Sequence, residues 1–499
     1  MAEPFLTIAL PDEPATVALA EDLAAILGPG DVIALSGGLG AGKTTFARAL
    51  IRAVADDAAL EVPSPTFTLV QTYAADRLTI GHFDLYRLGS ADEMDEIGLA
   101  DAVTEGAVLV EWPERGEGRL PAERLDIRFE IEGEGRWAEV SGGKAWRGRI
   151  ERTRAARALM ARAGFPSAAR RFLQGDASTR RYERVREAER SAVLMDWPKP
   201  TTPPVRDSRA AFRAQDVGAV LAVDAALRAI GLSAPDILAA DREAGLLLME
   251  DLGSEGMLVN GAPDPERYSV AIAALAAIHA HSRAALLPVP GGGEHHLLTL
   301  SAKVLMADLA VFTDWYVPHV LGGPLDRAAA ESFLAIWVAL CDRLAGAEQS
   351  WVLFDMQSPN LFWLPERAGI ARVGLIDFQD MFVGPAAYDV ASLCQDARVT
   401  ISAELEAALR ASYVDVRYGR TRTYNAENFS AAYAILGAVR TLKNMGVFAR
   451  LADHLGKTQY LQHLPRLNDY LARNLTHPVL SDLAVWYERH LPPTSQAAR

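Results

Sequence analysis

The chain has 499 residues, of which 50% are hydrophobic and 23% are charged. This composition excludes a largely disordered chain, and the length favours two to four domains of about 100–200 residues each. The longest apolar run, Val270 to Ile278, is shorter than the roughly 20 residues of a membrane span, and the acidic N-terminus does not resemble a signal peptide. The only cysteines are Cys341 and Cys394, so we expect a cytoplasmic protein without disulfides or cysteine-bound zinc. Because no apolar run is long enough, we also expect no membrane partner.

The net charge of −14 is concentrated in the first third of the chain. Residues 1–150 contain 13 basic and 26 acidic side chains, a net charge of −13, so the remainder is nearly neutral. Affinity for nucleic acid rests largely on basic contacts to phosphates. We therefore expect the acidic segment to dock on proteins and not to bind nucleic acid strongly by itself.

Residues 1–150 are predicted to form an α/β domain. A helix over Thr16–Leu27 is followed by a turn, a short buried strand over Val32–Leu35, a glycine-rich loop, and a helix from Lys43 to about Ala55. Val108–Val110 is another short strand. Leu125–Val140 alternates apolar and polar residues and breaks at a glycine pair, as in a β-hairpin.

Residues 151–499 are predicted to form a second domain, with an N-lobe at about 165–253 and a C-lobe at about 254–499. A basic helical stretch from Arg149 to Ala163 leads into this domain, and we place the boundary near residue 150. The proline-rich stretch at 197–204 is predicted to be a loop, and helical patterns dominate from about residue 211.

A phosphate-binding loop follows the Val32–Leu35 strand. Its sequence matches G-x-x-x-x-G-K-T and opens the next helix, which is the context that this motif requires. The glycines let backbone amides turn toward phosphates, Lys43 would reach the β- and γ-phosphates, and the Thr44 hydroxyl would bind Mg²⁺. The residues expected to contact the nucleotide here are Gly37, Gly38, Gly40, Gly42, Lys43, Thr44 and Thr45.

Three further stretches indicate which kind of P-loop protein this domain is: Ser64–Val70, His82–Arg87 and Val108–Trp112. Together with the phosphate-binding loop, and in this order, they make residues 10–145 closely resemble the TsaE family, the small ATPase of bacterial tRNA threonylcarbamoyladenosine synthesis. This resemblance implies an ATP-hydrolysing domain that works with the protein subunits that transfer the threonylcarbamoyl group. The acidic charge agrees with such protein docking, and we expect no strong direct binding of tRNA.

The same resemblance assigns roles to single residues. It implies that Asp84 and Glu111 lie near Mg²⁺ and the hydrolytic water, with Glu111 in the Walker-B-like place at a strand end. A carboxylate opposite Thr44 would complete an oxygen shell for Mg²⁺. Thr66 would lie in a switch-like loop that senses the nucleotide, and Trp112 would lie beside it.

A second chemical motif lies in the second domain. Asp355 to Asn360 has the D-x-x-x-x-N spacing of a phosphotransferase catalytic loop, and the apolar strand from Val373 ends in Asp377-Phe378. This combination is typical of phosphoryl transfer from ATP. Asp355 would accept the proton of a substrate hydroxyl, and Asn360 and Asp377 would hold Mg²⁺.

The upstream sequence contains the other parts of a kinase. Residues 174–182 are predicted to form a turn over the phosphates, which includes Ser178, and Leu246–Gly253 reads as a strand that runs into a hinge with Glu250 and Leu252. The strand at Val193–Met195 carries no lysine. Arg180 or Arg181 would then neutralise the phosphates, or both are surface residues in ion pairs.

This unit, about 155–495, resembles the aminoglycoside phosphotransferase-like superfamily, and within it the kinases that phosphorylate the anomeric hydroxyl of N-acetylmuramate and N-acetylglucosamine. The stretches that carry the resemblance begin at Gly175, Val193, Ser358, Leu375 and Gly384. The two resemblances together imply an α/β P-loop NTPase domain followed by an α+β bilobal, protein-kinase-like domain. Its amino-sugar substrate would be phosphorylated with ATP and Mg²⁺.

Two alternatives remain for the second domain. It could phosphorylate another hydroxyl compound, such as an aminoglycoside, choline or homoserine. It could also be a nucleotide-binding pseudokinase with a regulatory role, because Phe354 stands where the superfamily has His or Arg before the catalytic aspartate, and because the strand lysine is missing.

Overall fold

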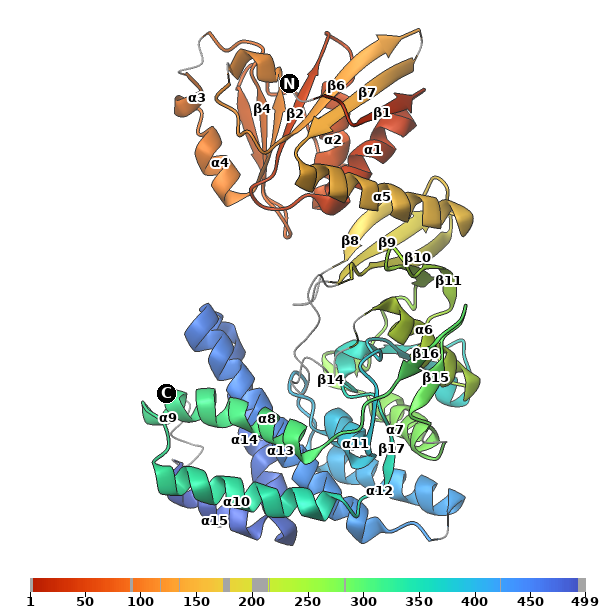
Figure 1. The fold of residues 1–499 in the computed structure, drawn as a ribbon, viewed down its shortest axis with the longest axis vertical. Helices are drawn as coiled ribbons and strands as arrows, with labels where there is room; N and C mark the ends of the chain where they lie inside the picture. Colours follow the sequence, from red (N-terminus) through yellow and green to blue (C-terminus); the bar gives the residue numbers. More distant parts are fainter. Residues whose placement is uncertain are drawn as a thin grey trace. The chain divides into compact units, whose positions relative to one another are not determined.

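The computed structural model describes residues 3–89, 93–116, 118–133, 135–173, 180–199, 214, 216–281, 284–421 and 423–491. The chain forms two compact units. The first unit contains Met1–Lys199 and Asp236–Asp251, and the second contains Pro200–Pro235 and Leu252–Arg499. The first unit therefore includes both the expected ATPase domain and the strands expected for the kinase N-lobe (Figure 1).

The ATPase part is built on a seven-stranded sheet with the order β1-β7-β6-β2-β5-β4-β3. The strands are β1 Leu6–Leu10, β2 Val32–Gly37, β3 Val70–Tyr73, β4 Ile80–Asp84, β5 Ala107–Glu111, β6 Leu125–Glu132 and β7 Gly135–Gly142. β2 pairs in parallel with β5 and β6, and β4 pairs in parallel with β5. Parallel pairing brings the carboxyl ends of β2, β4 and β5 to one edge, where Gly37, Asp84 and Glu111 end their strands.

The helices of this part are α1 Glu13–Ile26, α2 Lys43–Ala55, α3 Glu93–Glu96 and α4 Leu99–Glu105, with a 3₁₀ turn, η1, at Pro113–Gly116. The bounds predicted for α2, the hairpin β6–β7 and the strands β2 and β5 agree with the structure to within a few residues. α1 begins three residues before the predicted start. The reason is Asp12, whose carboxylate caps the helix by accepting a hydrogen bond from the Ala15 amide at 2.9 Å.

Helix α5, Lys144–Arg162, contributes side chains to two hydrophobic cores. Near its start, Trp146 and Ile150 pack in the core of the ATPase sheet. Near its end, Leu159 and Met160 pack in the core of the second sheet. The predicted boundary near residue 150 falls inside this continuous helix.

The second sheet of the first unit is antiparallel, with five strands in the order β11-β12-β10-β9-β8. The strands are β8 Ala169–Leu173, β9 Arg181–Glu187, β10 Arg190–Asp196, β11 Ile237–Asp241 and β12 Leu246–Glu250. The predicted strands around Val193 and Leu246 are confirmed as β10 and β12. The predicted turn at 174–182 connects β8 to β9, and its residues 174–179 lie outside the described residues.

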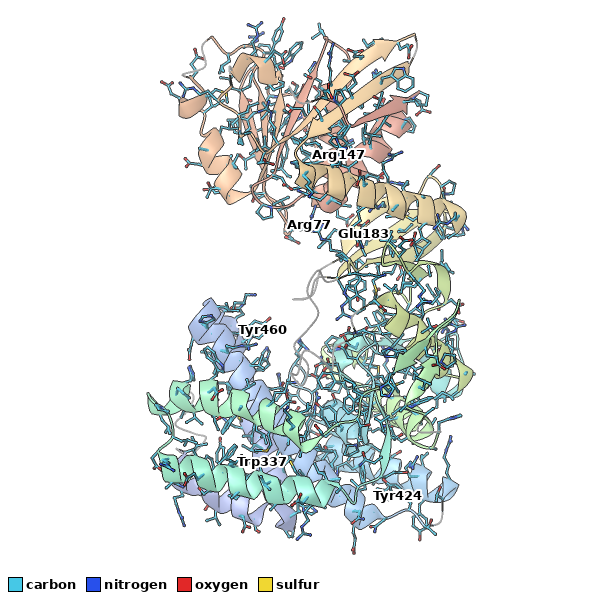
Figure 2. The ribbon with its side chains drawn as sticks, viewed as in Figure 1. Arg77, Arg147, Glu183, Trp337, Tyr424 and Tyr460 are labelled. Carbon is cyan, nitrogen blue, oxygen red and sulfur yellow. The ribbon has the colours of Figure 1, made fainter. Side chains whose placement is uncertain are left out.

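A largely buried ion network joins helix α1 of the ATPase part to the second sheet of the first unit. Arg170 on β8 bonds Asp22 of α1 at 2.8 Å and Glu183 of β9 at 2.6 Å, and Arg157 of α5 bonds Asp22 at 2.6 Å. The Arg170 side chain is 2% exposed. Arg77, labelled with Glu183 in Figure 2, adds a cation–π contact to Phe172 at 4.8 Å. Removing one partner of such a buried pair strongly destabilises the folded protein.

The second unit is mainly helical and carries short strands. Its longer helices are α6 Val217–Ala229, α7 Pro265–His279, α8 Ala302–Val311, α10 Arg327–Leu344, α11 Ala387–Cys394, α12 Ala403–Arg420, α13 Ala426–Leu455, α14 Leu464–Leu475 and α15 Ser481–His490. Two short strand pairs frame the predicted catalytic motif: β17 Gln349–Val352 pairs with β20 Phe382–Pro385, and β18 Leu361–Trp363 pairs with β19 Val373–Leu375. Smaller elements complete the unit: β13 Leu258–Val259, β14 Ala262–Pro263, β15 Leu286–Pro288, β16 Glu294–His296, α9 Val317–Leu321, the π-helical η3 Phe312–Tyr316, and the 3₁₀ turns η4 Ser358–Asn360, η5 Gly369–Arg372, η6 Thr458–His463 and η7 Pro478–Leu480.

Among the described residues, one helical stretch, Ala302–Leu321, is long and apolar enough by length and composition to cross a membrane, with a mean hydropathy of 1.2. Lys303, Asp308 and Asp314 interrupt it, so it contains no long uninterrupted run of apolar residues. Its elements α8, η3 and α9 pack against α13 within the second unit. A packed core helix of a globular protein can have the same length and apolar composition.

Replacing Arg170 by methionine should destabilise the first unit by about 3–5 kcal/mol, because Glu183 would be left buried without its partner. The measurement is the unfolding transition of the full chain, followed by calorimetry. Arg128→Met is the matched control, because Arg128 pairs with Glu130 on an exposed surface, where an ion pair contributes about 0–1 kcal/mol. Equal shifts for the two variants would contradict the structural role of Arg170.

Candidate functional site

The phosphate-binding loop leaves β2 and enters α2 through a series of left-handed glycines. Gly37, Gly40 and Gly42 have φ of 130°, 75° and 109°. A side chain at Gly37 is also excluded by space, since a Cβ there would lie 2.3 Å from the Phe129 carbonyl oxygen. The Lys43 ammonium folds back over the loop and donates to the carbonyls of Gly37 and Gly38 at 2.8 and 2.9 Å.

Trp112 covers Lys43. The Lys43 Nζ lies 3.7 Å from the centre of the Trp112 ring, which is a close cation–π contact. Burial lowers the pKa of Lys43, and the carboxylates of Glu111, Glu114 and Asp84 partly offset that effect. Trp112, which was expected beside the nucleotide, therefore contacts Lys43, which was expected to bind the phosphates. Thr45 follows on α2 and is half-buried.

Glu111 lies between two partners at the end of β5. Its Oε2 accepts a hydrogen bond from the Thr44 hydroxyl at 3.0 Å, and its Oε1 lies 3.0 Å from His82 Nε2. His82 is fully buried on β4, one strand away. His82 was not predicted as a site residue, although its place two residues before Asp84 on the same strand is a signal that could have identified it.

Asp84 holds the segment that precedes β3. It accepts hydrogen bonds from the hydroxyls of Ser64 at 2.9 Å and Thr66 at 2.7 Å through Oδ2, and from the Tyr86 amide at 3.0 Å through Oδ1. In the parallel pairing of β4 and β5, Asp84 stands opposite Glu111. The structure thus brings the two predicted acidic residues, Thr66 and the Lys43–Thr44 pair to one edge of the sheet. Ser64 was not predicted to take part.

In the second unit, the structure brings Asp355, Asn360 and Asp377 together. The Asn360 carboxamide donates to the Asp355 carbonyl at 2.9 Å, which closes the catalytic loop. The Ile376 amide donates to the Asn360 carbonyl at 3.1 Å and continues the β18–β19 pairing by one residue, so that Asp377 follows next to Asn360. Asp355 and Asp377 are both partly exposed.

The catalytic loop is held without the histidine or arginine that the resemblance implies before Asp355. Phe354 has φ of 78°, and its ring lies 5.7 Å from the Tyr388 ring and 5.8 Å from the Phe382 ring, centre to centre. Asp389 of α11 accepts the Leu353 and Phe354 amides at 2.7 and 3.0 Å.

Arg440 of α13 completes the support of this loop. It is 8% exposed, and its Nη1 donates to the Phe354 carbonyl at 3.1 Å. Its guanidinium lies 5.0 Å from the centre of the Tyr388 ring. A buried arginine from a distant helix therefore bonds the residue directly before Asp355, where the sequence lacks the expected basic neighbour.

The remaining predicted nucleotide contacts are dispersed over the two units. Ser178 lies outside the described residues. Arg180 is buried with its guanidinium 5.2 Å from the Trp197 ring, and Arg181 is exposed. Glu250 accepts the Asp236 amide at 3.2 Å in the first unit, and Leu252 is buried in the second.

The oxygen donors at both sites fit Mg²⁺. Thr44 and Glu111 form a hydroxyl–carboxylate pair, and in the second unit Asn360 and Asp377 offer an amide oxygen and a carboxylate on neighbouring segments. Throughout the described part of the chain, no group of three or more His, Cys, Asp and Glu residues could hold a metal ion. Such pairs suit Mg²⁺, which commonly takes one or two protein ligands together with substrate phosphates.

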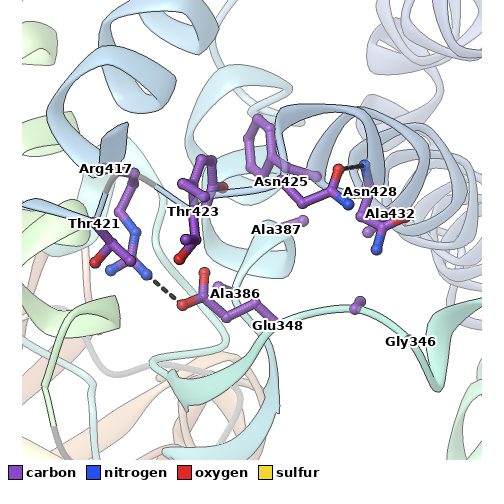
Figure 3. A pocket seen from close by; sticks show the side chains of 13 residues that line it. Gly346, Glu348, Ala386, Ala387, Arg417, Thr421, Thr423, Asn425, Asn428 and Ala432 are labelled. Atoms are coloured by element: carbon purple, nitrogen blue, oxygen red, sulfur yellow. Dashed lines mark hydrogen bonds and ion pairs between the residues drawn. The ribbon is translucent and has the colours of Figure 1, made fainter. Parts of the chain in front are cut away.

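A separate cavity of about 290 Å³ lies in the second unit, between the segment before β17, the start of α11 and the connection from α12 to α13. Figure 3 shows the ion pair between Arg417 and Glu348 at its wall, with Thr421, Thr423 and Asn425 close by. None of the predicted site residues that the structure describes lines it. Ala386 and Ala387 connect it to the start of α11, the helix that carries Asp389.

Fold and site together define two kinds of nucleotide-using domain, a P-loop ATPase and a protein-kinase-like phosphotransferase. The family model described as "Phosphotransferase enzyme family" matches residues 169–424, and the chain belongs to that family. Residues 10–138 match the model "Threonylcarbamoyl adenosine biosynthesis protein TsaE". The predicted family memberships and fold class are thereby confirmed.

Three relatives illustrate these matches. An N-acetylmuramate/N-acetylglucosamine kinase of Caulobacter vibrioides is 37% identical over 68% of this chain and 97% of its own length. The protein of the same name from Pseudomonas aeruginosa is 32% identical over 62% of this chain and 84% of its own length. A tRNA threonylcarbamoyladenosine biosynthesis protein TsaE of Rickettsia felis is 39% identical over 24% of this chain and 71% of its own length.

Replacing His82 by phenylalanine should lower ATP hydrolysis about 10–100-fold, because a buried partner that orients a metal-binding carboxylate typically contributes that much. ATP binding should stay close to wild type, since His82 does not belong to the phosphate-binding loop. Single-turnover hydrolysis and nucleotide titration measure the two effects. Unchanged hydrolysis would show that Glu111 does not need this partner.

Replacing Arg440 by methionine should lower the phosphotransfer kcat about 10–100-fold and change the KM for ATP little. The reason is that the Phe354 carbonyl would lose a charge-assisted hydrogen bond next to Asp355. Steady-state kinetics give both constants, and Arg440→Lys should recover part of the loss. A variant with a raised KM and a normal kcat would assign Arg440 to binding instead.

Proposed function

We propose that this chain is a bifunctional enzyme. Its first domain is the ATPase that supports threonylcarbamoylation of adenosine 37 in tRNA, and its second domain phosphorylates N-acetylmuramate or N-acetylglucosamine with ATP. The observation that carries the proposal for the kinase is the pairing of a complete Asp355–Asn360–Asp377 constellation with a 37% identical relative that the chain covers over 97% of its length. For the ATPase it is the Lys43–Thr44–Glu111 arrangement on a chain segment related to TsaE.

At the ATPase site, each residue has a task that follows from its position. The loop amides and Lys43 bind the phosphates, and Trp112 limits access of water to Lys43. Thr44 and Glu111 hold Mg²⁺, which neutralises charge on the phosphates when bound. Asp84 orients the hydrolytic water and, through Ser64 and Thr66, links the nucleotide to the segment before β3.

At the kinase site, Asp355 accepts the proton of the anomeric hydroxyl as the sugar oxygen attacks the γ-phosphorus. The bond to the β–γ bridging oxygen breaks, and ADP leaves. Asn360 and Asp377 hold Mg²⁺. Arg180 and Arg181, with Ser178, are the candidate cations of a phosphate lid, and Glu250 and Leu252 are the candidate hinge residues.

The partners and location follow from the two activities. The acidic first domain docks on the protein subunits that carry out threonylcarbamoyl transfer, since its net charge of −13 disfavours direct retention of tRNA. The second domain takes an amino sugar of the kind released in cell-wall recycling. We place both activities in the cytoplasm, where ATP is available and where the buried thiols of Cys341 and Cys394 stay reduced.

The two domains can be tested in one chain by two substitutions. Lys43→Ala should abolish support of tRNA modification in a strain that lacks its own TsaE, and it should leave sugar phosphorylation intact. Asp355→Asn should lower sugar phosphorylation at least about a hundredfold and leave tRNA modification intact, because it removes the general base. Mass spectrometry of tRNA nucleosides and a coupled assay of ADP release measure the outcomes.

The two substitutions also identify the ways in which the proposal fails. If wild-type chain restores no modified nucleoside, the role of the first domain is wrong. If neither amino sugar is phosphorylated while choline or an aminoglycoside is, the substrate is wrong and the kinase remains. Tight ATP binding without turnover on any hydroxyl compound would make the second domain a pseudokinase.

A further inference from the structure

The cavity of about 290 Å³ in the second unit has a polar lining that the proposed function does not use. Uncharged polar side chains line it where α12 ends and α13 begins: Thr421, Thr423, Asn425 and Asn428 (Figure 3). These residues are exposed, so solvent reaches the cavity. Buried apolar side chains line it as well: Ala386, Ala387, Phe429 and Ala432. The cavity therefore combines polar and apolar surface, as small-molecule sites commonly do.

An ion pair forms the charged part of the wall. Arg417, which is 4% exposed, bonds Glu348 through Nη2 and the Ala276 carbonyl through Nη1 at 3.3 Å. Two atoms of the pair, Arg417 Nε and Glu348 Oε2, are buried and have no hydrogen-bond partner among the described residues. Buried polar atoms in native proteins are nearly always bonded to protein, water or a ligand. This wall therefore has hydrogen-bonding capacity left for an occupant of the cavity.

The lining selects the class of occupant by charge and by size. Within the described part of the chain, Arg417 and Glu348 are the only charged residues that line the cavity, and their charges cancel. An ionic ligand would meet no uncompensated charge, whereas hydroxyl and amide groups would meet the threonines and asparagines. At about 30 Å³ for each water in the liquid, the volume equals about ten waters, which is close to the number of heavy atoms in a monosaccharide.

A line of buried polar side chains runs from this cavity to the catalytic loop. Tyr424 lines the cavity and shares a side-chain hydrogen bond with Tyr413. The Tyr413 hydroxyl bonds His279 Nδ1 at 2.8 Å, and His279 Nε2 lies 3.5 Å from Asp389 Oδ2. Asp389 in turn accepts the two backbone amides that precede the loop residue Asp355. Each member of the line thus contacts the next.

Burial makes this line sensitive to a change at either end. Tyr413 and Asp389 are fully buried, and His279 is 3% exposed. Burial raises the pKa of Tyr413 and Tyr424, so that both hydroxyls stay protonated and can donate. Hydrogen bonds in such surroundings polarise one another. A shorter route also exists, because Ala387 lines the cavity and begins the helix that carries Asp389.

We propose that the cavity is a regulatory site for an uncharged ligand of monosaccharide size, rich in hydroxyl and amide groups. Its binding is transmitted along the line from Tyr424 to Asp389 and changes how firmly the loop before Asp355 is held. The site is separate from both nucleotide sites, and it adds a control point to the second unit that its catalytic residues do not supply.

Binding is tested on the full-length chain with the methyl glycosides of glucose, galactose and N-acetylglucosamine. Their anomeric hydroxyl is blocked, so the proposed kinase reaction cannot consume them. In calorimetric titrations at least one should bind with a Kd of about 1 mM or below. Asn428→Phe and Thr423→Phe fill the cavity from two positions, and each should weaken this binding at least about tenfold. Glu427→Phe, at an exposed position that does not line the cavity, is the matched control and should bind normally.

Transmission is tested by hydrogen exchange. The bound glycoside should slow exchange of the Leu353 and Phe354 amides at least about threefold, because Asp389 accepts both and opening of this segment becomes rarer. Tyr413→Phe removes one hydroxyl from the line and keeps the ring, which stacks on Phe429 at 4.8 Å. This variant should bind the glycoside normally and show no such protection.

The outcomes separate this inference from the proposed function. Neither readout requires phosphoryl transfer, so a chain that phosphorylates no sugar would still answer the question. The inference is overturned if none of the glycosides binds, or if binding is unchanged in both Asn428→Phe and Thr423→Phe. It is also overturned if the wild-type chain shows no protection, or if Tyr413→Phe shows the same protection as the wild type.

Discussion

The buried guanidinium of Arg170 is the constraint on which the first unit depends. It bonds Asp22 of the ATPase part and Glu183 of the kinase sheet, so that one side chain belongs to both structures. Burial alone would lower the pKa of Arg170, but the two carboxylates raise it above that of an ordinary arginine, and the charge persists. A buried charge needs its partners in fixed places. Helix α1 of the ATPase part and the second sheet are therefore joined through side-chain ion pairs as well as through the chain itself.

Helix α5 also links the ATPase part to the second sheet, through apolar side chains, because its two halves pack in two different hydrophobic cores. A second contact involves the helix that begins at the nucleotide site. The helix α2 begins at Lys43 and ends before Asp56, which pairs with Arg171 of β8 at 3.3 Å. β8 in turn leads into the predicted phosphate lid of the kinase. Helix α2 thus begins at the ATPase site and, at its C-terminal end, contacts β8, the strand that precedes the predicted lid of the kinase.

The parts that the sequence predicted are those governed by local rules. The glycine-rich loop, α2 and the β6–β7 hairpin follow from turn residues and periodicity within a few residues of one another. The family resemblances likewise rested on short motifs. His82, Arg440 and the Asp22–Arg170 pair escaped prediction, because each acts through a partner 29, 86 or 148 residues away. Local sequence patterns such as hydrophobic periodicity do not indicate pairs so far apart, and only the fold brings the partners together.

Both candidate sites place a residue of unfavourable backbone conformation beside the chemistry. Trp112, Phe354 and Asp377 have φ of 58°, 78° and 58°, which costs a residue with a side chain about 1–3 kcal/mol. The compensation comes from groups fixed elsewhere: the Leu35 carbonyl accepts the Trp112 amide, while Asp389 and Arg440 bond the backbone of Phe354. A histidine before the catalytic aspartate is one way to hold such a loop. Because α11 and α13 already hold it from both sides, an aromatic residue can occupy that position, and the phenylalanine ring becomes the surface over which Lys443 lies.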